Sequence, residues 1–184
     1  MNEEKITKLC VWGSNTFGQL AFDNSNETTI KIPKLITFQI EVTEICCGFQ
    51  HSLLRTENGE LYTVGNNIIG QLGIKKEIKR RLAPTLLNIE GNVILSAANS
   101  NHNIIYTETG QIFTWGYNNC GQLGNGQQQT EWLPVDITQS VPVHPPTSVI
   151  KLFCGVNNTG LLLSNGKVIV FGNNEHGQLG LDTN

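Results

Sequence analysis

The chain contains 184 residues and carries a formal net charge of −3; 39% of its residues are hydrophobic and 15% are charged. Both fractions are low, and Gly, Asn, Gln, Ser and Thr make up the difference, which is typical of a turn-rich β protein and not of a helical one. The charge gives no general electrostatic basis for nucleic-acid binding. No stretch approaches the eighteen or so apolar residues that a membrane span requires, so no membrane association is expected.

The N-terminal sequence MNEEKITKLC has no apolar signal-peptide core, which predicts a cytoplasmic and/or nuclear protein. The five cysteines form an odd set without Cys-x-x-Cys spacing, so we expect reduced, mostly buried thiols and no zinc site. Cys46 and Cys47 are adjacent, and their side chains should point to opposite faces of a strand.

Short strand candidates follow one another along the whole chain. The first lies near Leu9–Trp12, and the next four are separated by turn signals such as Glu57-Asn58-Gly59. These four lie near Lys34–Phe38, Val42–Cys47, Ser52–Arg55 and Leu61–Val64. The same order of apolar segments and turns then recurs twice. No segment sustains a 3.6-residue period long enough to predict a helix, so the expected fold is all-β.

The pattern Gly-x-Asn-x-x-Gly-Gln-Leu occurs four times, with successive copies starting 52, 51 and 56 residues apart. The copies are Gly13–Leu20, Gly65–Leu72, Gly116–Leu123 and Gly172–Leu179. A period near fifty predicts an array of similar supersecondary units. Its glycines should adopt positive φ or allow close chain approach, its Asn should bond its own backbone, and its Gln should bridge neighbouring backbone groups.

Two positions depart from the repeat pattern in informative ways. Asn99 stands where the other units have Gly48 and Gly155, which is consistent with a left-handed backbone conformation at that position. Ala21 replaces the Gly that follows Leu in the other three motif copies. We therefore expect position 21 either to avoid positive φ or to shift locally.

Four strands per unit and a fifty-residue period indicate β-propeller blades. The Trp-Asp of WD repeats and the Gly-Gly of kelch repeats are both missing. The strings VWGSNTFGQL, FTWGYNNCGQLG and VFGNNEHGQLG, with an aromatic residue before the first Gly, resemble the regulator of chromosome condensation repeat family; TVGNNIIGQLG departs in having Val64 there. This resemblance covers nearly the whole chain.

The resemblance implies a ring of seven blades, which at this period would need about 360 residues. We therefore expect a single partial propeller domain over 1–184, holding about three of the seven blades. Its repeats span approximately 13–64, 65–115 and 116–171, and a fourth motif copy lies at 172–180. The chain is then a fragment, an open arc, or a protein that completes a ring by self-association.

His51 and His102 occupy equivalent positions in successive units, and the third unit has Asn158 there. Asn can replace a hydrogen-bonding residue but not a general base, so both histidines are expected to be structural. No nucleophile–base pair, phosphate-binding glycine loop or paired carboxylates are recognisable. We therefore predict no catalytic, cofactor-binding or metal site, and no enzyme activity.

One segment concentrates positive charge: Lys75, Lys76, Lys79, Arg80 and Arg81 supply five of the twelve basic residues within seven positions. The rest of the chain has seven basic and fourteen acidic residues. The segment is the candidate partner-binding site, for an acidic partner, a phosphate or an import receptor, and its alternative is a solvated loop. The longer third repeat offers a second candidate, Ser140–Thr147, whose VPVHPP sequence suggests an extended, polyproline-like loop.

The leading functional hypothesis is a non-catalytic scaffold whose variable loops dock other proteins. The alternative is a guanine nucleotide exchange factor-like regulator of a small GTPase such as Ran, which the resemblance implies, since the family's founding member looks like an exchange factor for Ran. That founder uses a protruding β-wedge and a basic N-terminal tail. No insertion here matches the wedge, and the chain begins Met1-Asn2-Glu3-Glu4-Lys5.

Overall fold

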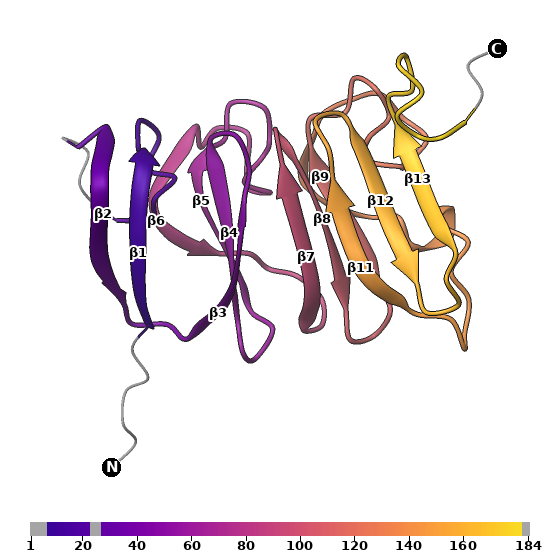
Figure 1. The fold of residues 1–184 in the computed structure, drawn as a ribbon, viewed down its shortest axis with the longest axis horizontal. Helices are drawn as coiled ribbons and strands as arrows, with labels where there is room; N and C mark the ends of the chain where they lie inside the picture. The colour runs from indigo at the N-terminus through magenta and orange to yellow at the C-terminus, as the bar shows by residue number, and fades with distance from the viewer. Residues whose placement is uncertain (1–6, 23–26, 182–184) are drawn as a thin grey trace.

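The computed structural model describes residues 7–22 and 27–181, and these residues form thirteen strands and one short 3-10 helix, η1 (Thr138–Ser140) (Figure 1). The strands are β1 (Thr7–Ser14), β2 (Thr29–Phe38), β3 (Val42–Cys47), β4 (His51–Thr56), β5 (Leu61–Asn66), β6 (Arg80–Leu86), β7 (Val93–Asn99), β8 (His102–Thr107), β9 (Ile112–Gly116), β10 (Glu131–Asp136), β11 (Val149–Cys154), β12 (Asn158–Leu163) and β13 (Val168–Gly172). Within this part of the chain, no helix is long and apolar enough to cross a membrane.

The strands form antiparallel sheets that follow one another in chain order (Figure 1). Two sheets have four strands, β3–β4–β5–β6 and β7–β8–β9–β10, whereas β11–β12–β13 has three and β1–β2 has two. The predicted all-β fold with four-stranded propeller blades is therefore confirmed, and the described residues give an incomplete ring. The strand that follows each of the first three motifs pairs with the strand that precedes the motif: β2 with β1, β6 with β5 and β10 with β9.

Buried apolar side chains fill the spaces between successive sheets, because each sheet covers its neighbour. Three separate clusters result. One cluster holds Leu54 and Val64, the next holds Leu53 and Trp115, and the last holds Ile104 and Leu161. All six residues of β8 are buried, since its sheet has a neighbour on both faces.

The motif loops use their own polar side chains to hold their backbone. The Oδ1 atoms of Asn67 and Asn118 accept hydrogen bonds from the amides of Leu72 and Leu123, at 3.0 Å each. The Oε1 atom of each motif Gln accepts from the amide two residues earlier, as Gln71 does from Ile69 at 3.0 Å. The predicted backbone role of Asn is confirmed. Gln binds one backbone amide, but its Nε2 donates to a side chain, as Gln122 does to Asn157 Oδ1 at 3.3 Å, so the prediction that it bridges two backbone groups was wrong. Both side chains are committed to the fold.

The backbone conformations of Ala21 and Asn99 both differ from those expected. Ala21 keeps positive φ, at 63°, and thus adopts the conformation of its glycine counterparts. Asn99 is not in the left-handed region, which is taken by Ser100 at φ 43° instead, so the prediction for Asn99 was wrong. Gly48 is required for a different reason: a Cβ there would overlap the ring of His51.

Three edge strands contain a proline: Pro33 lies in β2, Pro84 in β6 and Pro134 in β10. At each of the three sites the strand register shifts. Proline has no backbone N–H for the ladder, so it is tolerated at such irregularities, and it also discourages further strands from adding to the edge.

Two further expectations need correction. Cys10 and Cys47 are exposed and the remaining cysteines are half-buried, so the thiols are free but not mostly buried. The segment Ser140–Thr147 is not a continuous extended loop, because the amide of Thr147 donates to the carbonyl of His144 in a turn. Val141 is buried in the core, so part of this insertion serves packing.

Candidate functional site

The two equivalent histidines link successive sheets. His51 Nε2 lies 2.7 Å from Asn103 Oδ1, and His102 Nε2 lies 2.9 Å from Thr159 Oγ1. Because Asn103 and Thr159 themselves donate to the carbonyls of Gln71 and Gln122, both histidines must donate through Nε2. The predicted structural role of both histidines is confirmed.

Burial also keeps these imidazoles neutral. Desolvation lowers the pKa of His51 and the pKa of His102 from 6.5 to about 4. The side chains of both residues are fully inaccessible to solvent. A substrate therefore has no access to either ring.

The basic segment begins as a tight turn fixed by a motif side chain. Asn67 donates through Nδ2 to the carbonyls of Lys75, at 3.3 Å, and Ile78, at 2.7 Å. The backbone N–H of Asn67 also donates to the carbonyl of Lys79, at 2.8 Å. The cations thus lie on a loop whose backbone is anchored in the repeat.

Two of the lysines share an aromatic ring from the next sheet. Lys76 Nζ and Lys79 Nζ each lie 5.6 Å from the ring centre of Trp132 in β10. Lys79 Nζ also donates to the carbonyl of Lys76, at 3.0 Å. At exposed sites each cation–π contact contributes about 0.5–1 kcal/mol, so Trp132 limits the positions of the two charges.

The five candidate residues divide into two groups. Lys75, Lys76, Lys79 and Arg80 are exposed, and no ion pair joins them to another residue in the described part of the chain. Arg81 is half-buried in β6, and its Nε atom is buried with no hydrogen-bond partner among the described residues. The structure therefore places four cations at the surface and buries the fifth in part.

Trp132 is the residue of this site that sequence reasoning missed. A Cβ at Gly70 would contact Trp132, just as a Cβ at Gly18 would contact Leu82. The residue two positions before the outer-strand proline therefore lies beside the motif loop of the preceding repeat. Aligning Pro84 with Pro134 in the sequence places Trp132 opposite Leu82, and this equivalence could have identified Trp132 as a neighbour of the motif loop.

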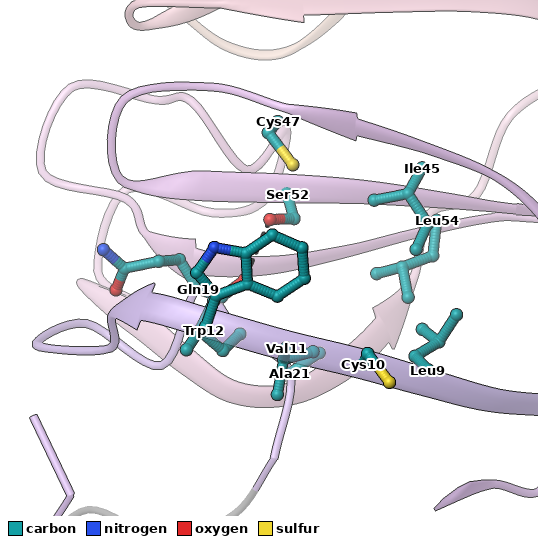
Figure 2. A pocket seen from close by; sticks show the side chains of 11 residues that line it. Leu9, Cys10, Val11, Trp12, Gln19, Ala21, Ile45, Cys47, Ser52 and Leu54 are labelled. Atoms are coloured by element: carbon teal, nitrogen blue, oxygen red, sulfur yellow. Dashed lines mark hydrogen bonds between the residues drawn. The ribbon is translucent and has the colours of Figure 1, made fainter. Parts of the chain in front are cut away.

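A second feature is a hollow of about 240 Å³ between β1 and the pair β3–β4. Figure 2 shows the Trp12 ring reaching from β1 toward Cys47 and Ser52. Trp12 is 60% exposed, and Ile45 is also exposed on the opposite wall. Among the described strands β1 pairs only with β2, whereas its counterparts β5 and β9 each lie between two partners.

Within residues 7–22 and 27–181, no three His, Cys, Asp or Glu side chains are grouped so that they could hold a metal ion. The polar groups that recur in every repeat are engaged in the fold. The basic loop beside Trp132 is one surface feature that distinguishes a repeat from the others.

The model of the regulator of chromosome condensation (RCC1) repeat matches residues 8–54, 58–106 and 109–162, and a second model of the same repeat matches 42–71 and 149–178. The chain belongs to this repeat family. The matched segments cover most of the chain. Each match of the first model begins in the last two strands of one sheet and ends in the first two strands of the next, so the unit of the family model is offset from the sheets by two strands.

Two curated relatives show how the repeat occurs in larger proteins. The probable E3 ubiquitin-protein ligase HERC4 of Homo sapiens is 31% identical over 84% of this chain, and the X-linked retinitis pigmentosa GTPase regulator of Mus musculus is 34% identical over 91%. The chain spans only 15% and 16% of the lengths of these two relatives. The similarity is therefore to their repeat regions.

Among solved structures, Prp20p of Saccharomyces cerevisiae superposes with a TM-score of 0.79 at 21% identity. The match covers 97% of this chain and 44% of Prp20p, whose structure was described together with its binding to Gsp1p and histones. It supports the propeller fold.

Proposed function

We propose that this chain is a non-catalytic protein-interaction scaffold that binds an acidic partner through Lys75, Lys76, Lys79, Arg80 and Arg81. The observation that carries the proposal is the contact of Lys76 and Lys79 with Trp132, which holds two cations in place at the surface. A loop that merely remains hydrated needs no such support.

The distribution of charge supports the same partner class. Outside the seven-residue segment the chain has an excess of seven acidic residues, so the basic loop is a local exception. An acidic protein surface is attracted to that loop and repelled elsewhere, which fixes its orientation. Neither nucleic acid nor membrane is proposed as a partner, and the proposed location is the cytoplasm and/or nucleus.

The proposal excludes an enzyme activity of the chain itself. The two histidines that could have acted as general bases are buried and hydrogen-bonded between sheets. The ligase relative is matched over 15% of its length, so its activity does not transfer with the repeats.

The test is affinity capture with charge variants, quantified by mass spectrometry at low salt. The variant K75Q/K76Q/K79Q/R80Q should lose specific partners, while K8Q/K31Q/K151Q/K167Q, which removes four other exposed lysines, should retain them. Partner recovery should also fall as ionic strength rises from about 0.05 to 0.3 M, because screening shortens the range of the attraction. Equal capture by both variants would rule out the loop as the binding site.

The second candidate is regulation of a small GTPase such as Ran in the manner of an exchange factor. One relative bears the name of a GTPase regulator, and Prp20p was described with its binding to Gsp1p. A nucleotide-release assay with Ran separates the two functions. Accelerated release at substoichiometric concentrations of the chain supports exchange, and an unchanged rate supports the scaffold.

Self-association is proposed as a further property, because the hollow at β1 exposes Trp12 and β1 pairs with a single neighbour among the described strands. Light scattering should then show a mass above that of the monomer, and Trp12→Ser should lower it. A monomeric wild-type chain at the concentrations used for capture contradicts this property and leaves the scaffold proposal standing.

A further inference from the structure

A groove runs between the outer strands of two neighbouring sheets, and residues of the basic loop, Lys75 and Ile78, line part of it. It encloses about 500 Å³ between β6 and β10. Lys75 and Arg81 lie at the end near the loop, and Glu90 lies in the connection that follows β6. The groove is therefore basic at one end and acidic at the other.

The middle of the groove is apolar. Leu86 of β6 and Leu133 of β10 line it from its two walls and are 51% and 55% exposed, and Phe113 of β9 lines it between them. Exposed leucines that face a common groove differ from apolar residues scattered singly over a surface, because one ligand can cover both at once.

Arg81 provides a specific polar contact. Its Nε atom is buried without a hydrogen-bond partner in the described part of the chain, and the side chain lines the groove. That buried Nε is closed to a ligand, but Arg81 as a whole is only half-buried and lines the groove. A ligand carboxylate at this end of the groove lies beside its positive charge, and a carboxylate is the group that matches a guanidinium best.

The edge prolines limit how a ligand can bind. Pro84 and Pro134 stand in the two strands that form the walls, and both strands are at the edges of their sheets. Since proline interrupts the row of backbone donors, an added β-strand is disfavoured. Recognition must then rest on side chains.

We propose that the groove between β6 and β10 binds an extended acidic peptide segment of a partner protein. Leucine-type side chains of that segment pack against Leu86 and Leu133, and its carboxylates meet Arg81 and Lys75. This inference rests on the proposed scaffold function and names the chemistry of the partner: an acidic segment that carries apolar side chains.

The test uses two labelled twelve-residue peptides and fluorescence anisotropy with the whole chain. Both peptides carry the same number of Asp and Glu residues, and only one carries two leucines, replaced by Ser in the other. We expect the leucine peptide to bind at least about tenfold more tightly, as expected for burial of two side chains. Equal affinity for both peptides, or no binding of either, overturns the groove proposal.

Variants separate the groove from the loop. Leu133→Ser should weaken the leucine peptide by about tenfold, whereas Leu35→Ser, which alters a residue 59% exposed on the outer strand β2, should leave its affinity unchanged. Arg81→Gln should lower the affinity for the acidic peptide. It should not change the affinity for a peptide that has Asn and Gln in place of Asp and Glu. Thermal melting of each variant confirms that it is folded.

The two proposals can fail independently. If K75Q/K76Q/K79Q/R80Q loses its partners while Leu133→Ser binds the leucine peptide like wild type, the groove proposal is wrong and the basic loop remains. If the leucine peptide requires Leu133 but the charge variant captures partners normally, the proposed role of the loop is wrong.

Discussion

Ala21 and Val64 depart from the repeat at two positions that meet in space. In the other repeats Gly73 lies against Trp115 and Gly124 against Phe171, so close that a Cβ would fall within 3 Å of either ring. Ala21 holds the equivalent place in the first repeat and shares a buried cluster with Val64. The Ala21 methyl thus fills space that the smaller Val64 leaves open, at the cost of positive φ.

The two substitutions should therefore be coupled. Val64→Trp alone should destabilise the protein, because the indole meets the Ala21 methyl, and Ala21→Gly should recover much of that loss. We expect a coupling free energy of at least about 1 kcal/mol from a double-mutant cycle measured by urea unfolding. Additive effects would show that the two positions are not packed together as described.

Buried neutral histidines predict how stability depends on pH. The pKa of His51 and that of His102 are about 4 in the folded state and 6.5 in the unfolded chain, so below pH 6.5 the unfolded state binds more protons. The stability from each histidine is fully present above pH 6.5 and falls by about 3 kcal/mol by pH 4. Urea unfolding from pH 7 to pH 4 measures this slope.

The variant H51N/H102N is the control for that slope, because Asn158 shows that Asn fits the equivalent position. The variant should remove most of the decrease in unfolding free energy between pH 6.5 and pH 4. The part of that decrease that comes from the carboxylates should remain. An unchanged slope would mean that other groups dominate the acid sensitivity.

At the scale of elements, each motif loop depends on its Asn to a degree set by burial. Asn67 is fully buried and makes three side-chain hydrogen bonds, to Leu72, Lys75 and Ile78. We expect Asn67→Ala to cost about 2–4 kcal/mol in unfolding free energy and to loosen the basic loop.

Asn174 provides a matched comparison, since it makes the same bond to the Leu179 amide in a more exposed loop. Asn174→Ala should cost less than about 1 kcal/mol, because water replaces the lost bonds. Similar losses for the two variants, measured by urea unfolding, would contradict the argument from burial.

The sequence was enough to predict where most strands lie, because turn signals and apolar segments recur. β2 is an exception, since it begins at Thr29 and not after Pro33 as predicted. The strand predicted at Val42–Cys47 is β3, and the one at Leu61–Val64 lies within β5. The pairing of β2 with β1 could not be predicted, since a repeat has no marked beginning and can be divided anywhere. Gly48 was misinterpreted for a similar reason: glycine allows both positive φ and close approach, and only the structure separates these uses.

The functional surface was only partly predictable. The basic run is visible in the sequence, but its contact with Trp132 joins residues more than fifty positions apart in neighbouring sheets. The partial burial of Arg81 and its place in the groove beside β10 are likewise not contained in the charge pattern.

At the scale of the whole molecule, stability should be highest in the interior of the row of sheets. β8 is buried along its full length, whereas β13 is half-buried or exposed throughout. Repeat arrays gain stability from each neighbour, so the terminal sheets open first. Amides of β8 should exchange at least about a hundredfold more slowly than those of β13 in native-state hydrogen exchange. Uniform exchange rates would instead indicate that the sheets unfold as one unit.

Trp132 belongs to one sheet, and the lysines that it contacts lie in the loop that joins β5 to β6 of the sheet before it. A ligand that contacts both the lysines and Trp132 links the two sheets, so its binding free energy opposes their separation. By thermodynamic linkage, a partner present at a hundred times its Kd adds about 2.7 kcal/mol to the stability of the folded chain. The melting temperature thus becomes a label-free measure of how much of the chain is bound to the partner. Conversely, a change that separates the two sheets also weakens binding of the partner.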